Sequence, residues 1–531
     1  MKFYFFMLFT SFSLLAFSQN NFDVQFYRYN IELNDANDTI YGKAEILVKF
    51  TEAANAVQFD LASLNKDGKG MIPLYVEGKS ASKMTKSEGK IMIQLLHMVK
   101  AHDTASFTIV YKGIPADGLI ISKNKYGDRT FFSDNWPNRA HNWIPCVDDP
   151  SDKAPVEFII TAPQKYQVIS NGVKVEETNL AGNKKRTHWR EDVPLPTKVM
   201  VIGAAEFAVQ LAGTIDGCLP VYSWVYPQDR DNGFYDYAQA TEVLPYFIRN
   251  VGPYPYAKLA NVQAKTRFGG MENANAIFYP ENSVTGARKD EATVVHEIAH
   301  QWFGNMATEK GFSHLWLSEG FATYMTILYM GNKYGSDTAL HMLREDREQV
   351  IKFSKHNNAP VVDTNPDYME LLNANSYQKG GWALHMLKKQ MGDSSFWKVI
   401  RKYYARYAGG NASTGDFQKV VEEVAGKKME GFFTQWLYTT GQPHLIISWK
   451  YDPKAKRVTG MVSQEKTSFK LPIEIGVRNA AGNITISKVD VAGPSTPFSI
   501  QVKEKPIELI PDPNVSLLFS GTVVEQLLNG G

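Results

Sequence analysis

Two histidines lie four residues apart in the segment VVHEIAHQWFG, with a glutamate directly after the first. Because an α-helix repeats every 3.6 residues, His296 and His300 share one helix face and their imidazoles can converge on one ion. Glu297 lies about 100° around the helix, beside such an ion rather than on it. This arrangement is typical of zinc hydrolases, in which two histidines bind the metal and the glutamate handles a proton. A helix that simply carries two histidines is the alternative.

A third candidate ligand follows this pair. Glu319 lies in WLSEGFATYM, and the turn-like segment TEKGFSHLW between the motifs lets two helices fold back on each other. Two neutral imidazoles plus one carboxylate leave one coordination position for water, whose pKa the metal lowers towards about 7. Glu297 can then take the proton of this water and later pass it to a leaving amine. The alternative for Glu319 is a solvated helix residue.

The two motifs resemble those of the zinc aminopeptidases of the gluzincin clan, the group of aminopeptidase N and the leukotriene-forming hydrolase. The stretch FGGMEN is similar to their Gly-x-Met-Glu-Asn segment. The resemblance implies that Glu272 holds the free α-amine of a peptide, which is largely charged at neutral pH. It also implies substrate contacts from its neighbours, where two glycines permit close approach of a peptide backbone: Gly269, Gly270, Met271 and Asn273.

A further similarity lies in NSYQKGGWALHML, where Tyr377 occupies the place of a family tyrosine before Lys-Gly. The resemblance implies that its phenol donates a hydrogen bond to the oxyanion of the reaction. A tyrosine that only packs is the alternative. Weaker matches extend the resemblance from about residue 20 to about residue 520.

The sequence departs from the family pattern at two points. Trp136 stands where the family often has a glutamine or glutamate that grips the first residue of the substrate. An indole cannot accept a hydrogen bond from an amine, so either Asp134 or Asn135 substitutes, or Trp136 stacks on the substrate. Many members also carry a large helical domain over the site, and its absence from this sequence predicts a more open cleft.

Hydrophobic periodicity predicts a multidomain α+β fold. Alternation in TIYGKAEILVKF and VEFIITAP predicts an N-terminal antiparallel β domain over residues 19–206. Helical spacing then predicts a thermolysin-like, mostly helical catalytic domain over residues 207–440, with one strand in LANVQAKTRFGG. Alternation returns after GQPHL and predicts a β-sandwich of five or more strands over residues 441–531. The expected helices span residues 235–250, 290–303, 317–333, 336–353, 380–391, 396–407, 414–424 and 429–437.

The first residues, MKFYFFMLFTSFSLLAFSQN, predict a signal peptide over residues 1–18 and a protein that is exported, periplasmic or secreted, with no membrane span after cleavage. An uncleaved anchor is the alternative. The net charge of +2 gives no sign of nucleic-acid binding. Cys146 and Cys218 can pair or remain two buried thiols.

These observations predict an exported zinc metallo-aminopeptidase that binds one zinc ion per chain and peptides with a free N-terminus. A thermolysin-like zinc endopeptidase has the same metal ligands, and Glu272 distinguishes the two. A catalytically silent, zinc-containing protein that binds peptides is the third hypothesis, and the presence of Glu297 and Tyr377 disfavours it. The sequence specifies neither an oligomeric state nor a side activity on epoxides.

Overall fold

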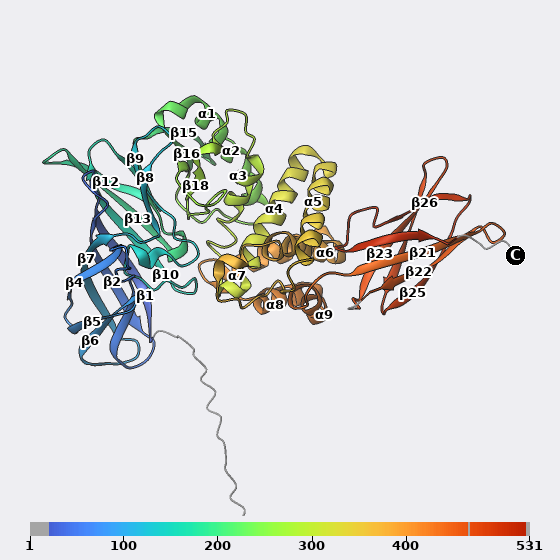
Figure 1. Cartoon of the computed structure of the whole chain (residues 1–531), viewed down its shortest axis with the longest axis horizontal. Coiled ribbons are helices and arrows are strands. Elements are labelled where there is room, and N and C mark those ends of the chain that lie inside the picture. The colour runs from blue at the N-terminus through green and yellow to red at the C-terminus, as the bar shows by residue number, and fades with distance from the viewer. Residues whose placement is uncertain (1–20, 466–467, 527–531) are drawn as a thin grey trace, which may run out of the picture.

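A computed structural model describes residues 21–465 and 468–526, so the predicted signal peptide lies outside the described residues. Three regions follow one another along an elongated molecule: a β region, a mostly helical region and a second β region (Figure 1). This confirms the multidomain α+β fold class, whereas the domain limits drawn from the sequence stay predictions. Within the described ranges, no helix is both long and apolar enough to cross a membrane.

The N-terminal region contains three sheets, with strand orders β12-β13-β10-β1-β2-β7-β4, β11-β14-β9-β8 and β3-β6-β5. Side chains alternate between buried and exposed along β2, as period-two patterning predicts. The large sheet is not antiparallel throughout, because β1 pairs with β10 in parallel over Tyr27–Glu32 and Val156–Thr161. β10 returns to the sheet after a long connection, which leaves its direction free. The strands are β1 (Phe22–Glu32), β2 (Ile40–Phe50), β3 (Ala54–Asp60), β4 (Gly70–Glu77), β5 (Ala81–Ser87), β6 (Lys90–Val99), β7 (Thr104–Ile114), β8 (Leu119–Lys123), β9 (Arg129–Ser133), β10 (Lys153–Pro163), β11 (Gln167–Ser170), β12 (Val173–Leu180), β13 (Lys184–Pro196) and β14 (Ile202–Ala205).

The middle region begins with a four-stranded sheet of order β15-β16-β17-β18. Only β17 was expected, because the apolar runs of β16 and β18 lack the alternation that marks a half-buried strand. The strands are β15 (Ala208–Ile215), β16 (Leu219–Val225), β17 (Leu259–Ala264) and β18 (Ala276–Pro280), and a short pair is formed by β19 (Thr308–Glu309) and β20 (Asn411–Ala412).

Nine α-helices are present in the described part of this region, close to the positions that helical spacing predicts. The first of the expected helices is divided in two, and α3 ends at Ala299 rather than at residue 303 because the chain turns there. The helices are α1 (Arg230–Tyr237), α2 (Ala240–Asn250), α3 (Glu291–Ala299), α4 (Trp316–Tyr334), α5 (Ser336–Ser354), α6 (Gly380–Met391), α7 (Asp393–Tyr407), α8 (Thr414–Ala425) and α9 (Glu430–Phe433), with π turns over Asn375–Lys379 and Thr434–Tyr438.

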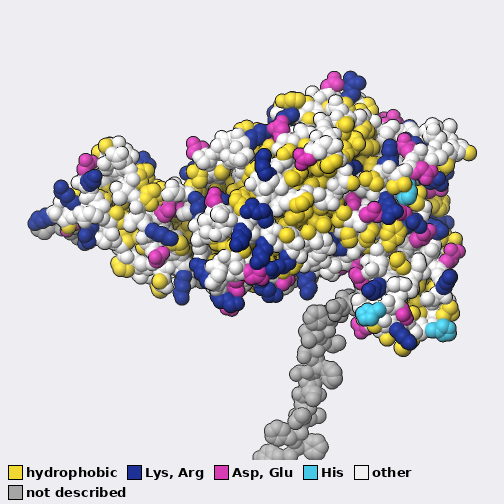
Figure 2. Space-filling view, turned by 180° about the vertical axis from the view of Figure 1, so that it is seen from behind, with side chains coloured by type: hydrophobic (Ala, Val, Ile, Leu, Met, Phe, Trp, Pro, Cys, Tyr) yellow, Lys and Arg dark blue, Asp and Glu magenta, His cyan; other side chains and the backbone are white. Residues whose placement is uncertain are grey.

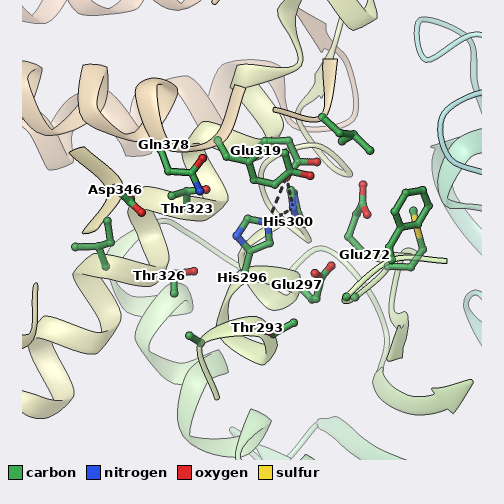
Figure 3. A pocket seen from close by; sticks show the side chains of 18 of the residues that line it. Glu272, Thr293, His296, Glu297, His300, Glu319, Thr323, Thr326, Asp346 and Gln378 are labelled. Carbon is green, nitrogen blue, oxygen red and sulfur yellow. Dashed lines mark hydrogen bonds and ion pairs between the residues drawn. The ribbon is translucent and has the colours of Figure 1, made fainter. Parts of the chain in front are cut away.

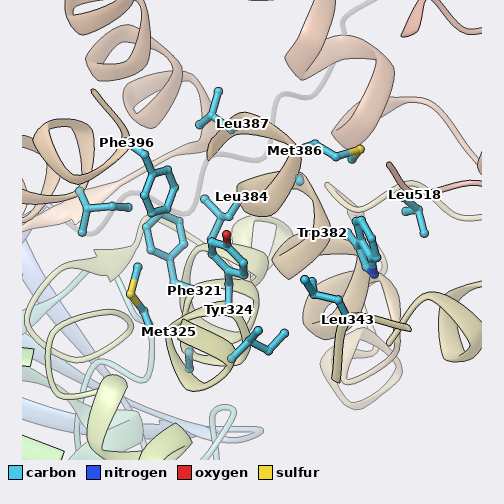
Figure 4. Packing of buried hydrophobic residues seen from close by; sticks show 14 of the residues in the cluster. Phe321, Tyr324, Met325, Leu343, Trp382, Leu384, Met386, Leu387, Phe396 and Leu518 are labelled. Carbon is cyan, nitrogen blue, oxygen red and sulfur yellow. The ribbon is translucent and has the colours of Figure 1, made fainter. Parts of the chain in front are cut away.

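Helix α4 is the centre of the helical core. Its Phe321, Tyr324 and Met325 are buried against Leu384 of α6 and Phe396 of α7 (Figure 4). Each large apolar side chain buried in this way stabilises the fold by roughly 1.5–3 kcal/mol. Since Glu319 lies on the same helix, this packing fixes the position of a candidate metal ligand.

Two glycines allow α4 and the start of α6 to touch. A Cβ added at Gly320 would lie 2.9 Å from the backbone of Gly380 and 3.1 Å from the carbonyl oxygen of Ser376. Such distances leave no room for a side chain. Glu319 directly precedes Gly320 in α4, and Tyr377 lies three residues before Gly380 at the start of α6. The contact between the two glycines therefore brings Glu319 and Tyr377 close together.

The C-terminal region is a β-sandwich, with sheet orders β25-β22-β21-β27 and β24-β23-β26. Its seven described strands meet the prediction of five or more. Arg347 of α5 pairs with Asp512 at 2.5 Å, and His385 of α6 lies 2.8 Å from the Val515 carbonyl, so the sandwich is bound to the helical core by polar contacts. The strands are β21 (His444–Asp452), β22 (Arg457–Gln464), β23 (Leu471–Asn479), β24 (Ile484–Val491), β25 (Ser495–Gln501), β26 (Pro506–Pro511) and β27 (Ser520–Glu525).

The two cysteines do not form a disulfide bond. Cys146 is buried, whereas Cys218 is an exposed thiol, so the expectation of two buried thiols is wrong for Cys218. Basic and acidic side chains are interspersed on the face seen in Figure 2, as the small net charge leads one to expect.

Candidate active site

His296, His300 and Glu319 converge where α3 meets α4 (Figure 3). Their ligand atoms all lie within 4.8 Å of one another. The Nε2 atoms of the two imidazoles are 3.0 Å apart, and each lies 3.2 Å from Glu319 Oε2. A tetrahedral zinc ion with bonds of about 2.0–2.1 Å separates its nitrogen and oxygen ligands by about 3.3 Å. The three side chains therefore fit such an ion.

The surroundings of His300 fix which of its nitrogens can bind a metal. Its Nδ1 lies 3.1 Å from the carbonyl oxygen of Phe303 and 3.1 Å from Ser318 Oγ. Because a carbonyl only accepts hydrogen bonds, Nδ1 carries the proton and Nε2 keeps its lone pair for a ligand. Gly304, at φ 106°, makes the turn that brings this carbonyl back to the imidazole.

Electrostatics favour a positive charge at the centre of this cluster. Burial alone would lower the pKa of His300, but the Glu319 carboxylate outweighs it and raises that pKa to about 10. Burial likewise opposes ionisation of Glu319, yet the neighbouring imidazoles hold its pKa well below the usual range. A bound dication would occupy this place, so the charge balance also suits the metal.

Two further carboxylates line the same pocket without joining the three. Glu297 is 5% exposed, and burial raises its pKa well above the ordinary value, with Glu272 and Glu319 adding to the rise and His300 opposing it. Glu272 is also 5% exposed, and its buried Oε1 has no hydrogen-bond partner among the described residues. A buried carboxylate oxygen without a donor is costly, which suggests that the donor comes with a ligand.

The backbone of Glu272 is held in place by two side-chain amides and by pairing of the preceding residue. Its carbonyl oxygen accepts a hydrogen bond of 2.6 Å from Asn305 Nδ2 and one of 3.1 Å from Gln301 Nε2. Met271 pairs with Phe278 of β18 through two backbone hydrogen bonds, at 2.8 and 3.0 Å. Glu272 is thereby fixed relative to the helix that carries both histidines.

Tyr377 lies in the π turn over Asn375–Lys379 and lines the pocket. Its ring is stacked on that of His296, with centroids 6.0 Å apart and planes 14° apart. Burial raises the pKa of this phenol well above 10, and Glu319, Glu272 and Glu297 add to the rise. The hydroxyl therefore remains a hydrogen-bond donor at physiological pH.

The cavity enclosed by these residues has a volume of about 400 Å³. Its lining includes four carboxylates and two imidazoles but no lysine or arginine: Glu272, Glu297, Glu319, Asp346, His296 and His300. Such a lining attracts cationic groups and repels anionic ones.

The sequence matches two models of one peptidase family. The peptidase M1 N-terminal domain matches residues 24–199, and the peptidase family M1 domain matches residues 235–436. The chain belongs to peptidase family M1. Members of this family are zinc enzymes, which agrees with the three converging ligands.

Curated relatives of this M1 peptidase are longer proteins. It is 28% identical to aminopeptidase M1-C of Oryza sativa subsp. japonica over 59% of the chain and 37% of that protein. It is 28% identical to human glutamyl aminopeptidase over 60% of the chain and 35% of that protein, and 26% identical to the probable aminopeptidase 2 of Sulfurisphaera tokodaii over 79% and 54%. The chain thus spans about a third to a half of the length of these relatives.

The tryptophan that departs from the family pattern lines the pocket of this M1 peptidase. Trp136 packs edge-on against Phe268 and Phe312, with centroids 5.9 and 5.8 Å away. Asp134 and Asn135 are both fully buried and engaged elsewhere, Asp134 with Arg139 at 2.7 Å. Asp134 and Asn135 are therefore not free to bind a substrate amine, and stacking by Trp136, which is 2% exposed, stays a prediction.

The predicted contact residues do not all reach the cavity. Gly269, Gly270 and Met271 line it beside Glu272, whereas Asn273 is 1% exposed and is not part of the lining. Sequence reasoning missed Gln301, Asn305 and Ser318, which hold site residues in place, and a group of polar residues at the far end of the pocket: Thr293, Thr323, Thr326, Asp346 and Gln378. Gln301 and Asn305 follow the second histidine directly in HQWFGN, so their proximity was a usable signal.

Proposed function

We propose that this M1 peptidase is an exported zinc aminopeptidase that removes the N-terminal residue from peptides. The observation that carries this proposal is the buried Glu272 carboxylate, whose Oε1 finds no donor in the part of the chain that the structure describes, and which lines the same pocket as the three metal-ligating side chains. An α-ammonium group supplies both the missing donors and a compensating charge. A substrate anchored there places its first peptide bond, rather than an internal one, at the reacting centre.

His296, His300 and Glu319 would hold zinc through Nε2, Nε2 and a carboxylate oxygen. When bound, zinc polarises the substrate carbonyl and lowers the pKa of water. Gly270 packs directly against Glu297, because a Cβ at this position would collide with its carboxylate. The glycine therefore leaves Glu297 its place beside the metal ligands, where it can handle a proton.

Glu297 acts as general base and then as general acid. It takes a proton from the water that attacks the carbonyl carbon, and it gives this proton to the nitrogen of the leaving amine as the C–N bond breaks. Its raised pKa makes the carboxylate a stronger base towards the proton of the water than an ordinary carboxylate, and the acid formed holds that proton until the amine takes it. The Tyr377 hydroxyl donates to the carbonyl oxygen as negative charge develops there.

Two measurements test the proposal. Alanine p-nitroanilide should be hydrolysed, whereas its N-acetylated form should not, and a preference for the acetylated form would indicate an endopeptidase instead. The Glu297→Gln variant should retain one zinc per chain and lose about a hundredfold or more of its turnover. A zinc-loaded Glu297→Gln protein with full activity would contradict the role of Glu297.

The proposal of export is supported by the apolar run after Lys2 in the sequence. Expression in a bacterium, followed by N-terminal sequencing of the periplasmic or secreted protein, tests it. A mature protein that begins near Gln19 is the expected result, and a protein that keeps its first residues in the cytosol would contradict it.

A further inference from the structure

The catalytic pocket has a second end, on the side away from Glu272 (Figure 3). Past the three ligating side chains it continues between α4 and α5, where it is lined by Thr323 and Ile327 of α4 and by Met342 and Asp346 of α5. The hydroxyl and amide groups of Thr293, Thr326 and Gln378 also line this end. This end therefore combines apolar side chains with neutral polar groups around one carboxylate.

Asp346 is half-buried at the edge of the apolar stripe of α5. On the same side of the helix lie Leu343 and Val350, which are 2% and 1% exposed and are spaced as in a buried stripe. A half-buried aspartate that lines a pocket is usually paired or hydrogen-bonded. The pocket thus carries a charge that the packing of α5 does not require.

Two of the cations near Asp346 are engaged with other groups, and Arg344 projects about 200° around the helix from it. Arg347 pairs with Asp512, and His341 lies 3.3 Å from Glu345. Within the described residues, Asp346 has no ion pair, and only burial and Glu345 act on its pKa, raising it to about 7. A cation brought into the pocket would restore the charged carboxylate and gain its hydrogen bonds.

The direction of a bound peptide sets which residue meets Asp346. With the α-amine at Glu272 and the first carbonyl at the three metal ligands, the leaving part of the peptide runs towards this second end. Thr323 lies one helical turn beyond Glu319, or about 6 Å along α4, and an extended peptide advances about 3.3–3.6 Å per residue. This distance exceeds one residue of extended chain, so a long side chain on the residue just after the cleaved bond is needed to reach the space between Thr323 and Asp346.

We infer that Asp346 makes the enzyme select peptides with lysine or arginine directly after the first residue. The inference rests on the proposed aminopeptidase function and adds the substrate class to it. The long apolar stem of either side chain packs on Ile327 and Met342, while its charged end reaches the carboxylate and the surrounding hydroxyl groups. Glutamate at the same position meets a lining with four carboxylates and no lysine or arginine, and is rejected.

The test compares three amides: Ala-Lys-NH2, Ala-norleucine-NH2 and Ala-Glu-NH2. Norleucine keeps most of the lysine stem without the charge. The holoenzyme should show a kcat/KM for the lysine amide about tenfold above that for the norleucine amide, since a half-buried charged hydrogen bond gives a discrimination of this order. The glutamate amide should be the poorest substrate of the three.

The Asp346→Asn variant should bring the ratio of the lysine to the norleucine value close to one. This ratio of kcat/KM values does not depend on the fraction of active enzyme. Asp346→Ser serves as a second variant if the Asp346→Asn protein does not fold. Glu345→Gln is the matched control, because it removes the same charge one residue away on a side chain that is 58% exposed. It should keep the wild-type ratio.

An Asp346→Asn enzyme that keeps the wild-type ratio would overturn the inference, as would an equal loss in Glu345→Gln. If the holoenzyme cleaves alanine p-nitroanilide yet shows no preference among the three amides, this inference fails and the aminopeptidase function stands. If no substrate with a free amine is hydrolysed at all, both fail.

Discussion

Gly270→Ala is a small change that should separate catalysis from folding. A Cβ at this position would lie 2.5 Å from Cδ and 2.7 Å from Cγ of Glu297, whereas ordinary van der Waals contact begins at 3.4 Å. The Glu297 carboxylate must therefore move by about 1 Å (3.4 − 2.5 = 0.9 Å). A displacement of this size in a reacting group lowers turnover about a hundredfold. Because the obstacle is the end of a flexible side chain, the free energy of unfolding should change by less than about 1 kcal/mol.

Gly311→Ala is the matched control for this experiment. A Cβ there would meet nothing within 4 Å, and the residue does not line the pocket, so it can be replaced without moving Glu297. Both changes restrict the unfolded chain equally, and that effect cancels in the comparison. The assay measures kcat on alanine p-nitroanilide, zinc per chain, and the urea midpoint of each variant. Equal turnover in the two variants would refute the reasoning, and so would loss of zinc from Gly270→Ala.

Three further outcomes are expected. Tyr377→Phe should retain zinc and lose about a hundredfold or more in turnover; a loss of only tenfold would indicate that the ring merely packs. A chelator should abolish hydrolysis. Adding one equivalent of zinc to the stripped enzyme should restore it, as a titration of activity against added zinc would show. Burial lowers the pKa of His385 to about 3, so the unfolded chain binds a proton near pH 6.5 before the folded one does. Stability should then be complete above pH 6.5 and about 3 kcal/mol lower at pH 4.5 (2 × 1.36). His385→Gln should remove this part of the slope in urea unfolding at pH 7 and pH 4.5.

Local spacing was enough to predict the elements that carry the metal ligands. The four-residue interval of His296 and His300 requires a helix, and the apolar periodicity of α4 predicts the helix that presents Glu319. The resemblance, not the spacing, pointed to Glu272 and Tyr377. Both residues line the pocket, but the local sequences FGGMEN and NSYQKGG do not predict the distance of Glu272 or Tyr377 from the histidines.

The remaining features depend on contacts between distant segments. Asp346 enters the pocket only because α5 folds back along α4, and its sequence context, LREDREQV, is that of an ordinary surface helix. The sequence also could not predict that Asp134 and Asn135 are buried and hydrogen-bonded, since their partners come from residues near 139 and near 200. The strands β16 and β18 were missed because their faces are both covered, which removes the alternation that a single sequence can reveal.

The clustering of carboxylates in this pocket explains why many packing contacts and hydrogen bonds fix its side chains in place. Glu272, Glu297 and Glu319 line one cavity, and the other two carboxylates add to the rise in the pKa of Glu297. Like charges at this depth destabilise a fold unless a cation offsets them. The packing of α4, the glycine contact with α6 and the bonds from Asn305 and Gln301 therefore have to hold groups that would otherwise move apart. In the proposed function, cations meet this pocket at three points along its length, the α-amine, the metal and a basic side chain beyond the cleaved bond, in the order of a peptide read from its N-terminus.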